Sequence, residues 1–307
     1  MKKDMLTRAI IKTLCYAQTF SYPLTISELF KYLISSKKIA REELLLALYN
    51  NQHLFEQKDE YVVLRGDAKL IRERSKRKTY SRKKLAKALW ISQVLSYIPT
   101  VKLIGLSGSL SMYNAKREDD IDLFFITSRN SLWITRALVN IILLFIGEKR
   151  GRNEKLATDK ICTNMFLSEE ALKIEKKQRN LYTAHEVAQL KVLFSRDYIY
   201  QEFLKENKWV LRFLPHAFEI YKKSFKNNRQ IIPLVLLPLE YLIYQIQLLY
   251  MKRRITNEVV KRRVAMFHPL KRDNAILVIH KLKVKHQARL LKTAVIRGGK
   301  TTFNLAN

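Results

Sequence analysis

The sequence feature that most constrains the fold is a long stretch without a chain breaker, because residues 67–98 contain neither glycine nor proline. The whole chain of 307 residues has only 7 Gly and 6 Pro, the two residues that most favour tight turns. Sandwiches and propellers need many turns and normally carry more of both. The sequence therefore favours helices, and residues 67–98 are expected to form one long helix that ends at Pro99.

This expected helix changes character along its length. Its first part, residues 69–87, carries ten Lys or Arg and a single acid, Glu73. Its later part carries apolar residues at helical spacing: Leu85, Leu89, Val94, Leu95 and Ile98. The helix is therefore expected to begin in solvent and to end in the core. The basic part is either a solvated face or a surface that follows the phosphates of a nucleic acid, and both interpretations stay open.

The net charge points to polyanionic partners. The chain has 58 Lys and Arg against 27 Asp and Glu, a net charge of +31, and most of it lies towards the two ends. Residues 1–100 carry +11 and residues 191–307 carry +17, while residues 101–190 carry only +3. Two basic flanks predict binding to nucleic acid or to another polyanion, with general solubility as the alternative.

The cysteine content and the N-terminal sequence predict a cytoplasmic protein. Two cysteines, Cys15 and Cys162, are too few for a disulfide scaffold and suit a reducing compartment. No apolar segment of signal-peptide type follows the polar first residues. Residues 231–251 are apolar enough to cross a bilayer, but Pro238 and Glu240 favour a buried helix of a soluble domain over membrane association.

Residues 1–66 are expected to form a small winged-helix-like unit. Three helical patterns are followed by a hairpin, which is the element order of a winged helix-turn-helix domain. Thr25 and Glu28 form a capping box that marks the start of the second helix. The third helix, the expected DNA-reading element, opens with Glu42 and Glu43, whose charges would repel phosphates. DNA reading and protein contact therefore both stay open.

The middle of the chain has the pattern of a small α/β core. Apolar strands are expected at 101–106, 120–127 and 160–167, with an apolar helix at 131–147. From residue 169 onward almost every segment has a helical pattern. The expected fold is an α/β (α+β) core with a small mixed sheet, flanked by the winged-helix-like unit and an all-helical C-terminal domain with a basic tail. The expected boundaries are 1–66, 67–99 for the basic connecting helix, 100–168 for the core and 169–307.

One group of residues in this core carries recognisable chemistry. Gly108 and Ser109 follow the first strand, and Asp120 and Asp122 begin the second. Glycine lets the backbone approach a ligand closely, and the free amides of a helix that starts here suit phosphate. Asp120 and Asp122 are two residues apart on a strand, so both carboxylates leave the same face. Two ionised carboxylates that close together repel each other unless a cation lies between them.

Hard oxygen ligands of this kind suit Mg²⁺, which proteins usually share with substrate phosphates. Lys116 is a further candidate phosphate ligand in the spacer between Ser109 and Asp120. The alternative interpretation is a charged strand end, in which Lys116 or Arg117 pairs with the two carboxylates.

The order of an apolar residue, Gly-Ser, a ten-residue spacer and Asp-apolar-Asp-apolar resembles the signature of the DNA polymerase beta nucleotidyltransferase superfamily. The resemblance covers roughly residues 101–167, where the expected strands, turn and helices follow the order of that family. The wider chain resembles a prokaryotic group of nucleotidyltransferase-like proteins that carry an N-terminal winged-helix segment.

The resemblance implies transfer of a nucleotidyl group from a nucleoside triphosphate to a hydroxyl acceptor. It implies that Asp120 and Asp122 bind Mg²⁺ or Mn²⁺ and act in catalysis, and that Gly108 and Ser109 hold phosphates. The basic flanks favour nucleic acid as the acceptor.

The expected third strand departs from the family pattern. Members of the superfamily place a third carboxylate on a later strand, where it helps to activate the attacking hydroxyl. Here the strand at 160–167 contains Asn164 but no acid, and Asp159 lies just before it. Asp159 and Asn164 are therefore the candidates for the third position. The alternative function is a catalytically degenerate protein that binds nucleotides or regulates by binding DNA.

Overall fold

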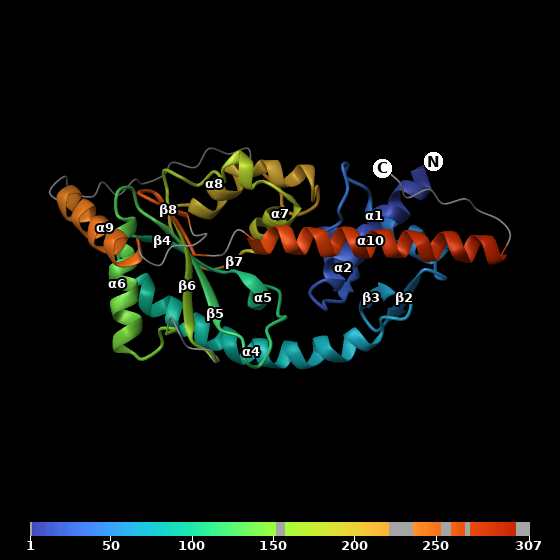
Figure 1. Ribbon diagram of the computed structural model, residues 1–307, viewed down its shortest axis with the longest axis horizontal. Helices are drawn as coiled ribbons and strands as arrows, with labels where there is room; N and C mark the ends of the chain where they lie inside the picture. The colour runs from blue at the N-terminus through green and yellow to red at the C-terminus, as the bar shows by residue number, and fades with distance from the viewer. Residues whose placement is uncertain (1, 152–156, 221–235, 253–258, 268–270, 299–307) are drawn as a thin grey trace.

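The structure, a computed structural model, describes residues 2–151, 157–220, 236–252, 259–267 and 271–298. Its shape is elongated, with a small sheet towards one end and a larger sheet towards the other (Figure 1). The helix α4 (Lys69–Ser96) runs along one edge of the molecule and joins the two parts (Figure 1). The long helix expected at 67–98 is therefore confirmed.

The N-terminal part consists of three helices and a three-stranded antiparallel sheet of order β1-β3-β2. The capping box is confirmed, because the Glu28 amide donates to Thr25 Oγ1 and the Thr25 amide donates to the Glu28 carboxylate. Asp59, at φ 54°, makes the tight turn of the expected hairpin. The elements are α1 (Lys2–Gln18), β1 (Leu24–Thr25), α2 (Ile26–Lys31), α3 (Arg41–Asn50), β2 (Phe55–Lys58) and β3 (Tyr61–Leu64).

The larger sheet has six strands in the order β7-β4-β5-β6-β9-β8. Only β5 and β6 run parallel, joined by a crossover through helix α6, and all other neighbours are antiparallel. The three strands and the helix expected between 101 and 168 are confirmed with small shifts at their ends. They are β4 (Val101–Leu106), the single turn α5 (Gly108–Ser111), β5 (Ile121–Thr127), α6 (Leu132–Phe145) and β6 (Ile161–Ser168).

The prediction of an all-helical C-terminal domain is wrong, since three strands from this part complete the sheet. β7 pairs with β4, and the β8–β9 hairpin pairs with β6. Their apolar runs of two to four residues fit a helix as well as a strand. They form strands because the edges of β4 and β6 offer backbone groups that pair with them. The elements are α7 (Leu181–Gln189), β7 (Lys191–Ser195), α8 (Ile199–Glu206), α9 (Leu236–Lys252), β8 (Val259–Lys261), β9 (Val264–Met266), α10 (Lys271–Gly298) and the short 3-10 turns η1 (Lys176–Gln178) and η2 (Lys208–Arg212).

Alternation along β5 builds a core on each face of the large sheet. Leu123 and Phe125 pack towards α4 and α6, while Phe124 and Ile126 pack towards α7 and α8. Residues two apart on a strand share a face, so Asp122 belongs to the same face as Phe124 and Ile126. The carboxylate therefore points to the side of the sheet that α7 covers.

The apolar segment 231–251 is described only from Leu236, and its earlier residues lie outside the described part. Within α9, Glu240 is only 2% exposed, and its carboxylate accepts from the amides of Trp133 (2.9 Å) and Ile134 (2.8 Å). These amides belong to the first turn of α6, where an anion is favourable. Glu240 is therefore a helix cap. The opposite face of α9 exposes large apolar residues, among them Tyr241, Leu242, Leu249 and Tyr250, so the prediction of a buried helix holds for one face.

None of the described helices combines the length and the apolarity that crossing a membrane requires.

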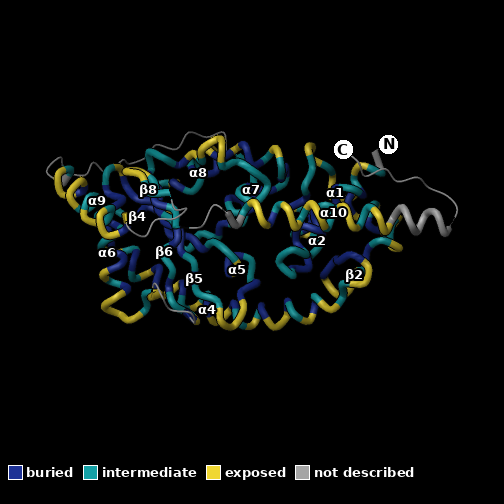
Figure 2. Tube along the Cα trace, viewed as in Figure 1, coloured by how far each residue is buried: buried dark blue, intermediate teal, exposed yellow. Residues whose placement is uncertain are grey.

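Buried and exposed residues alternate along α4 (Figure 2), and its cations divide into the same two sets. Arg74, Arg77 and Lys84 recur at helical spacing and are at most 9% exposed, on the stripe that continues into the apolar end of the helix. The sequence indicated a solvated or a phosphate-binding face for these cations, but these three residues instead attach α4 to the rest of the protein. Lys69, Arg72, Lys76, Arg82 and Lys83 are exposed.

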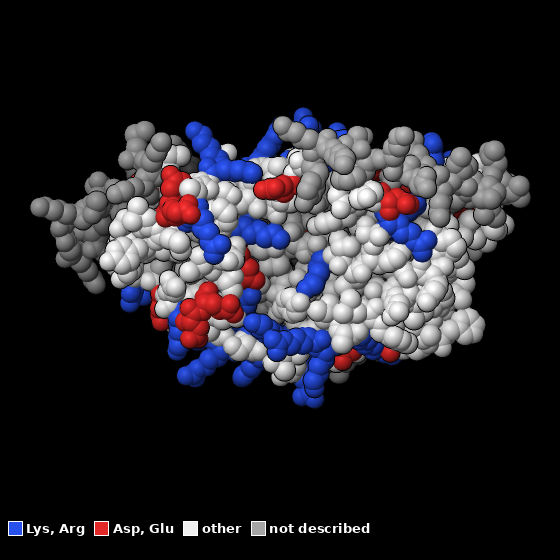
Figure 3. Space-filling view, turned by 180° about the vertical axis from the view of Figure 1, so that it is seen from behind, with Lys and Arg blue, Asp and Glu red and all other residues white. Residues whose placement is uncertain are grey.

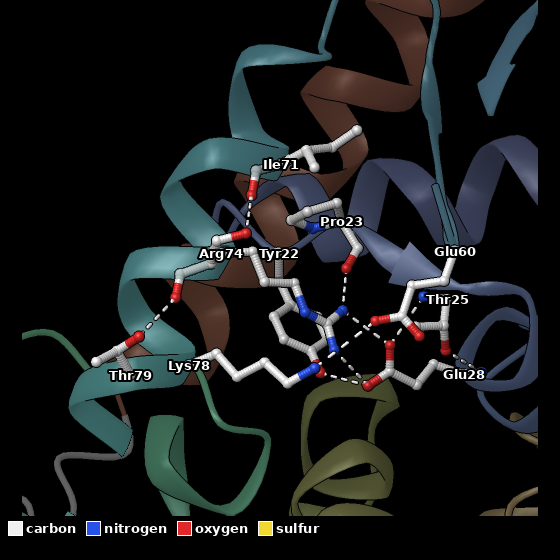
Figure 4. Close-up of polar contacts among 10 residues, drawn as sticks. Tyr22, Pro23, Thr25, Glu28, Glu60, Ile71, Arg74, Lys78 and Thr79 are labelled. Carbon is white, nitrogen blue, oxygen red and sulfur yellow. Dashed lines mark hydrogen bonds and ion pairs between the residues drawn. The ribbon is translucent and has the colours of Figure 1, made fainter. Parts of the chain in front are cut away.

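Arg74 forms the most connected of these contacts (Figure 4). Its guanidinium donates two hydrogen bonds of 2.8 Å to the carboxylate of Glu28 and a third to the Pro23 carbonyl. The rings of Tyr22 and Tyr61 lie 4.1 and 4.8 Å from it, and the Tyr22 hydroxyl also donates to Glu28. We call Glu28, Arg74 and Tyr22 the Arg74 cluster. It ties α4 to the start of α2.

Seen from behind, Lys and Arg side chains gather along the edge of the molecule that α4 forms (Figure 3). A second set of exposed cations lies on α10, which packs against α1 through hydrogen bonds from His280 to the Lys12 carbonyl and from Lys283 to Gln18. The rest of the basic C-terminal flank lies partly outside the described residues.

Candidate functional site

A cavity of about 490 Å³ lies between the N-terminal part and the large sheet. One end is lined by Gly108, Ser109, Asp120 and Asp122, and Lys116 lies beside them. The other end is lined by residues of α1, of the segment that follows it, and of α7. The residues that the sequence singled out for phosphate and metal thus share one cavity, although they are separated by up to fourteen positions along the chain.

Asp120 and Asp122 lie on the same face of the sheet, as strand alternation predicts, while Ile121 and Leu123 are fully buried in the core. Ligand atoms of Asp120, Asp122 and Cys162 lie within 4.8 Å of one another. We call these three residues the carboxylate–thiol group. Two carboxylates fit Mg²⁺ or Mn²⁺, whereas the sulfur of Cys162 would favour softer ions only after it lost its proton.

Gly108 lies directly against this group, at φ +64°. A Cβ atom at this position would come 2.8 Å from Asp122 Oδ2, closer than real Cβ contacts allow. The Ser107 amide also donates to the carbonyl of Asp122, at 3.1 Å. Only glycine therefore fits between the turn and the carboxylate, and the turn itself is held against the start of β5.

The turn after β4 is further fixed by Asp119. Its carboxylate accepts from Ser109 Oγ at 3.0 Å and from the Lys116 amide at 2.9 Å. The side chain of Lys116 is exposed at the rim of the cavity. Asp119, which was not among the residues singled out from the sequence, therefore orders the spacer between the Gly-Ser pair and the metal-binding candidates.

The third strand position is occupied by Cys162 and Asn164. Cys162 pairs with Asp122 across the parallel β5–β6 ladder, and the register then skips Asn164, which forms a bulge. The bulge turns the Asn164 amide onto the Asp122 carboxylate, to which it donates a hydrogen bond. Asn164 therefore lies at the expected site, where it is a hydrogen-bond partner of Asp122.

Asp159 does not join this group. It precedes β6 at φ 61° and forms an ion pair of 2.5 Å with the buried Lys84. Lys84 also donates to the carbonyls of Arg117 and Asp119. The register of β6 places Cys162, and not Asp159, beside Asp122, so Asp159 serves to anchor α4.

The cation that pairs with Asp120 is Arg150, whose Nη1 lies 2.5 Å from Asp120 Oδ2. The alternative interpretation of the sequence, a charged strand end, expected Lys116 or Arg117 as the partner of the carboxylates. Arg150 is 40% exposed and follows α6, thirty residues away in the chain, so no local pattern indicated it.

Cys162 was not among the residues singled out from the sequence. Burial, together with the charges of Asp122 and Asp120, raises the pKa of its thiol to about 12. The thiol is therefore protonated at neutral pH in the structure described here. The register between β5 and β6 places Cys162 beside Asp122. The sequence carries no signal for that register, so it could not indicate Cys162.

No family model, no curated protein and no solved structure matches the chain.

Proposed function

We propose that this protein is a metal-dependent nucleotidyltransferase that moves a nucleotidyl group from a nucleoside triphosphate to a hydroxyl acceptor. The observation that carries the proposal is the convergence of Gly108, Ser109, Asp120 and Asp122 at one end of a single cavity. Phosphate binding needs a close backbone approach, and phosphoryl chemistry needs a field that offsets negative charge. The turn at Gly108 offers the close backbone approach, and a divalent ion held by Asp120 and Asp122 would supply the field.

In this proposal Asp120 and Asp122 hold the divalent ion, and the turn at Gly108 and Ser109 lies beside the phosphates. Mg²⁺ or Mn²⁺, when bound, would neutralise charge on the attacking and leaving oxygens during in-line displacement at the α-phosphorus. Arg150, which pairs with Asp120, would turn to the phosphates where a cation took its place. Asn164 fixes the orientation of Asp122.

A second candidate function is nucleotide binding without transfer. The observation in its favour is the third strand position, where a protonated thiol and an amide stand in place of a carboxylate. An amide cannot accept the proton of an attacking hydroxyl, so this position lacks the base that the resembling family uses.

We propose a nucleic acid as the acceptor, bound through the exposed cations of α4. The N-terminal part has the element order of a winged-helix unit, but its α3 exposes Glu42, Glu43, Leu46 and Tyr49 to solvent. These residues suit protein contact better than phosphate.

Because the proposed contacts join cations of α4 to phosphates, binding to duplex DNA or RNA should weaken with salt. Charge-removing changes at Arg72 and Lys76 should each reduce the log–log slope by about 0.9 on duplex, and changes at Glu42 should not. A salt-independent affinity would exclude this acceptor.

Activity is tested by incubating the protein with each labelled nucleoside triphosphate, Mg²⁺ or Mn²⁺, and total cell extract. We expect label in one fraction of the extract with wild-type protein and with Glu118→Gln, and none with Asp122→Asn. Glu118 is an exposed acid near the site that does not line the cavity, so it controls for a general loss of charge. Metal-dependent nucleotide binding without any transfer would support the second candidate.

A further inference from the structure

The cavity extends well beyond the carboxylates, and its far end has a different chemistry. Tyr182, Glu186 and Gln189 line it from α7. They are spaced four and three residues apart and so share one face of the helix. The residues of α7 on the other side, Ala184, Val187 and Ala188, are buried in the core. The face of α7 that carries aromatic, acid and amide side chains is therefore the one turned to the cavity.

The N-terminal part supplies the rest of this end. Tyr16 of α1 and Phe20, just after α1, both line the cavity. Tyr16 stacks on His185 of α7, with ring centroids 3.9 Å apart and an angle of 18° between the planes. Burial lowers the pKa of His185 to about 3, so the stacked imidazole is neutral at physiological pH. This stack joins α1 to α7, and residues from both helices line the cavity as one wall.

Hydrogen bonds to the core hold this wall in place. The guanidinium of Arg77, which is 9% exposed, donates to the Phe20 carbonyl at 3.1 Å and to Asn114 Oδ1 at 3.2 Å. The amide of Asn114 donates to the same Phe20 carbonyl at 3.0 Å. The backbone amide of Asn114 donates to the Ser109 carbonyl at 2.9 Å, so one network joins Phe20 to the Gly-Ser turn. The geometry of the wall relative to the carboxylates is therefore fixed before a ligand enters.

Glu186 disfavours a phosphate group beside α7, and the guanidinium of Arg77, which also lines the cavity, already donates to the Phe20 carbonyl and to Asn114. Aromatic rings favour a flat partner, and a carboxylate with an amide favours a partner that offers N–H donors. A nucleobase has both properties, and stacking of a base on an aromatic side chain is a common and sequence-tolerant contact.

We propose that the wall formed by Tyr16, Phe20, Tyr182, Glu186 and Gln189 binds the nucleobase of the nucleoside triphosphate whose phosphates lie at Asp120 and Asp122. This inference rests on the proposed function, and it gives the N-terminal part a role inside the substrate site. Residues of α1 and α7 would then contact the base, and the turn at Gly108 and strand β5 would lie beside the phosphates.

The test measures two kinds of ligand by calorimetry on the full-length protein in the presence of Mn²⁺. The first kind is each of the four nucleoside triphosphates, and the second is inorganic triphosphate. At least one nucleoside triphosphate should bind more tightly than inorganic triphosphate. Tyr182→Ala should reduce this preference by about 5- to 150-fold, the range of one base–aromatic stack, and leave the affinity for inorganic triphosphate unchanged. Tyr49→Ala, which truncates an exposed tyrosine on α3, is the matched control and should leave both affinities unchanged.

Unchanged binding of inorganic triphosphate by Tyr182→Ala also shows that the variant is folded. Equal affinity for all ligands, or a preference that survives in Tyr182→Ala, would overturn the base-binding wall while leaving the phosphate end intact. Absence of metal-dependent binding by both kinds of ligand would overturn the proposed function and this inference with it.

Discussion

The Arg74 cluster and the carboxylate–thiol group each place a carboxylate against an arginine, Arg74 in the first and Arg150 beside the second, but they differ in how the carboxylates are bonded. In the Arg74 cluster one carboxylate accepts from a bidentate guanidinium, a tyrosine hydroxyl and a backbone amide. In the carboxylate–thiol group Asp120 pairs with Arg150, which is itself 40% exposed, and Asp122 accepts from the neutral amide of Asn164. A buried bidentate pair is what stability requires, whereas carboxylates that meet an exposed arginine and a neutral amide, and that line a cavity, suit a ligand of opposite charge.

The largest effect on stability is expected at the Arg74 cluster. Glu28→Gln keeps the shape of the side chain but leaves the buried charge of Arg74 without its counterion. Since Glu28 is partly exposed, the loss in the free energy of unfolding should lie at the low end for a broken buried pair, about 3 kcal/mol. Denaturant melts of the two proteins measure it.

The control is Glu60→Gln, which removes an exposed partner of Lys78, 3.7 Å away in the same region (Figure 4). We expect a change below about 0.5 kcal/mol there. Equal losses in the free energy of unfolding for the two variants would show that the Arg74 cluster stabilises the fold no more than an ordinary surface ion pair does.

A smaller loss is expected where the turn meets Asp122. Gly108→Ala introduces both the strain of a positive φ and a contact of 2.8 Å with Asp122 Oδ2, so it should cost about 2 kcal/mol and weaken metal binding. Gly147→Ala has a similar φ of +69° with nothing within 4 Å, so it isolates the strain at about 1 kcal/mol. Thermal melts with and without Mn²⁺ check both values, and identical behaviour of the two variants would show that Gly108 is not packed on the site.

The Arg74 cluster should also make the protein sensitive to acid. Burial alone would raise the pKa of Glu28, but the hydrogen bonds and charge of Arg74, with donors from Tyr22 and Thr25, lower it below the ordinary value of 4.5. A lowered folded-state pKa stabilises the fold above pH 4.5, and this stabilisation is lost as the pH falls through the folded-state value. Wild-type stability should therefore fall more steeply below pH 4.5 than that of Glu28→Gln. Parallel curves would contradict the assigned cause.

The smallest effect is expected at Asp120 in the absence of metal. Asp120→Asn loses the ion pair with the partly exposed Arg150, but it also relieves repulsion from Asp122. These terms oppose each other, so the free energy of unfolding should change by less than about 1 kcal/mol. A large loss of stability in metal-free buffer would instead identify Asp120 as a structural residue, like Glu28.

The sequence predicted the features that depend on local pattern. The capping box at Thr25, the unbroken helix α4 and the alternation around Ile121 each follow from the chemistry of neighbouring residues, and all three are confirmed. The placement of the Gly-Ser turn beside Asp122 was also indicated, because the turn and the strand are close in the chain.

Features that depend on distant pairing could not be predicted. Arg74 and Lys84 belong to a run of similar cations, so the sequence could not show that their side chains are buried. Only their ion pairs with Glu28 and Asp159 distinguish them from the exposed cations. The strands β7 to β9 are too short for their pattern to exclude a helix. Cys162 and Arg150 enter the site through the register of β6 and the end of α6, for which one sequence carries no signal.

The central claim is that Asp120 and Asp122 together bind a divalent metal and a nucleoside triphosphate. The most direct measurement is the affinity for nucleoside triphosphate with and without Mn²⁺, for wild type, Asp122→Asn and the control Glu118→Gln. We predict binding that needs the metal in wild type and in Glu118→Gln, and a loss of at least about tenfold in Asp122→Asn, since one anionic ligand is removed. Equal affinities in all three proteins, with or without metal, would show that the two carboxylates are only a charged strand end.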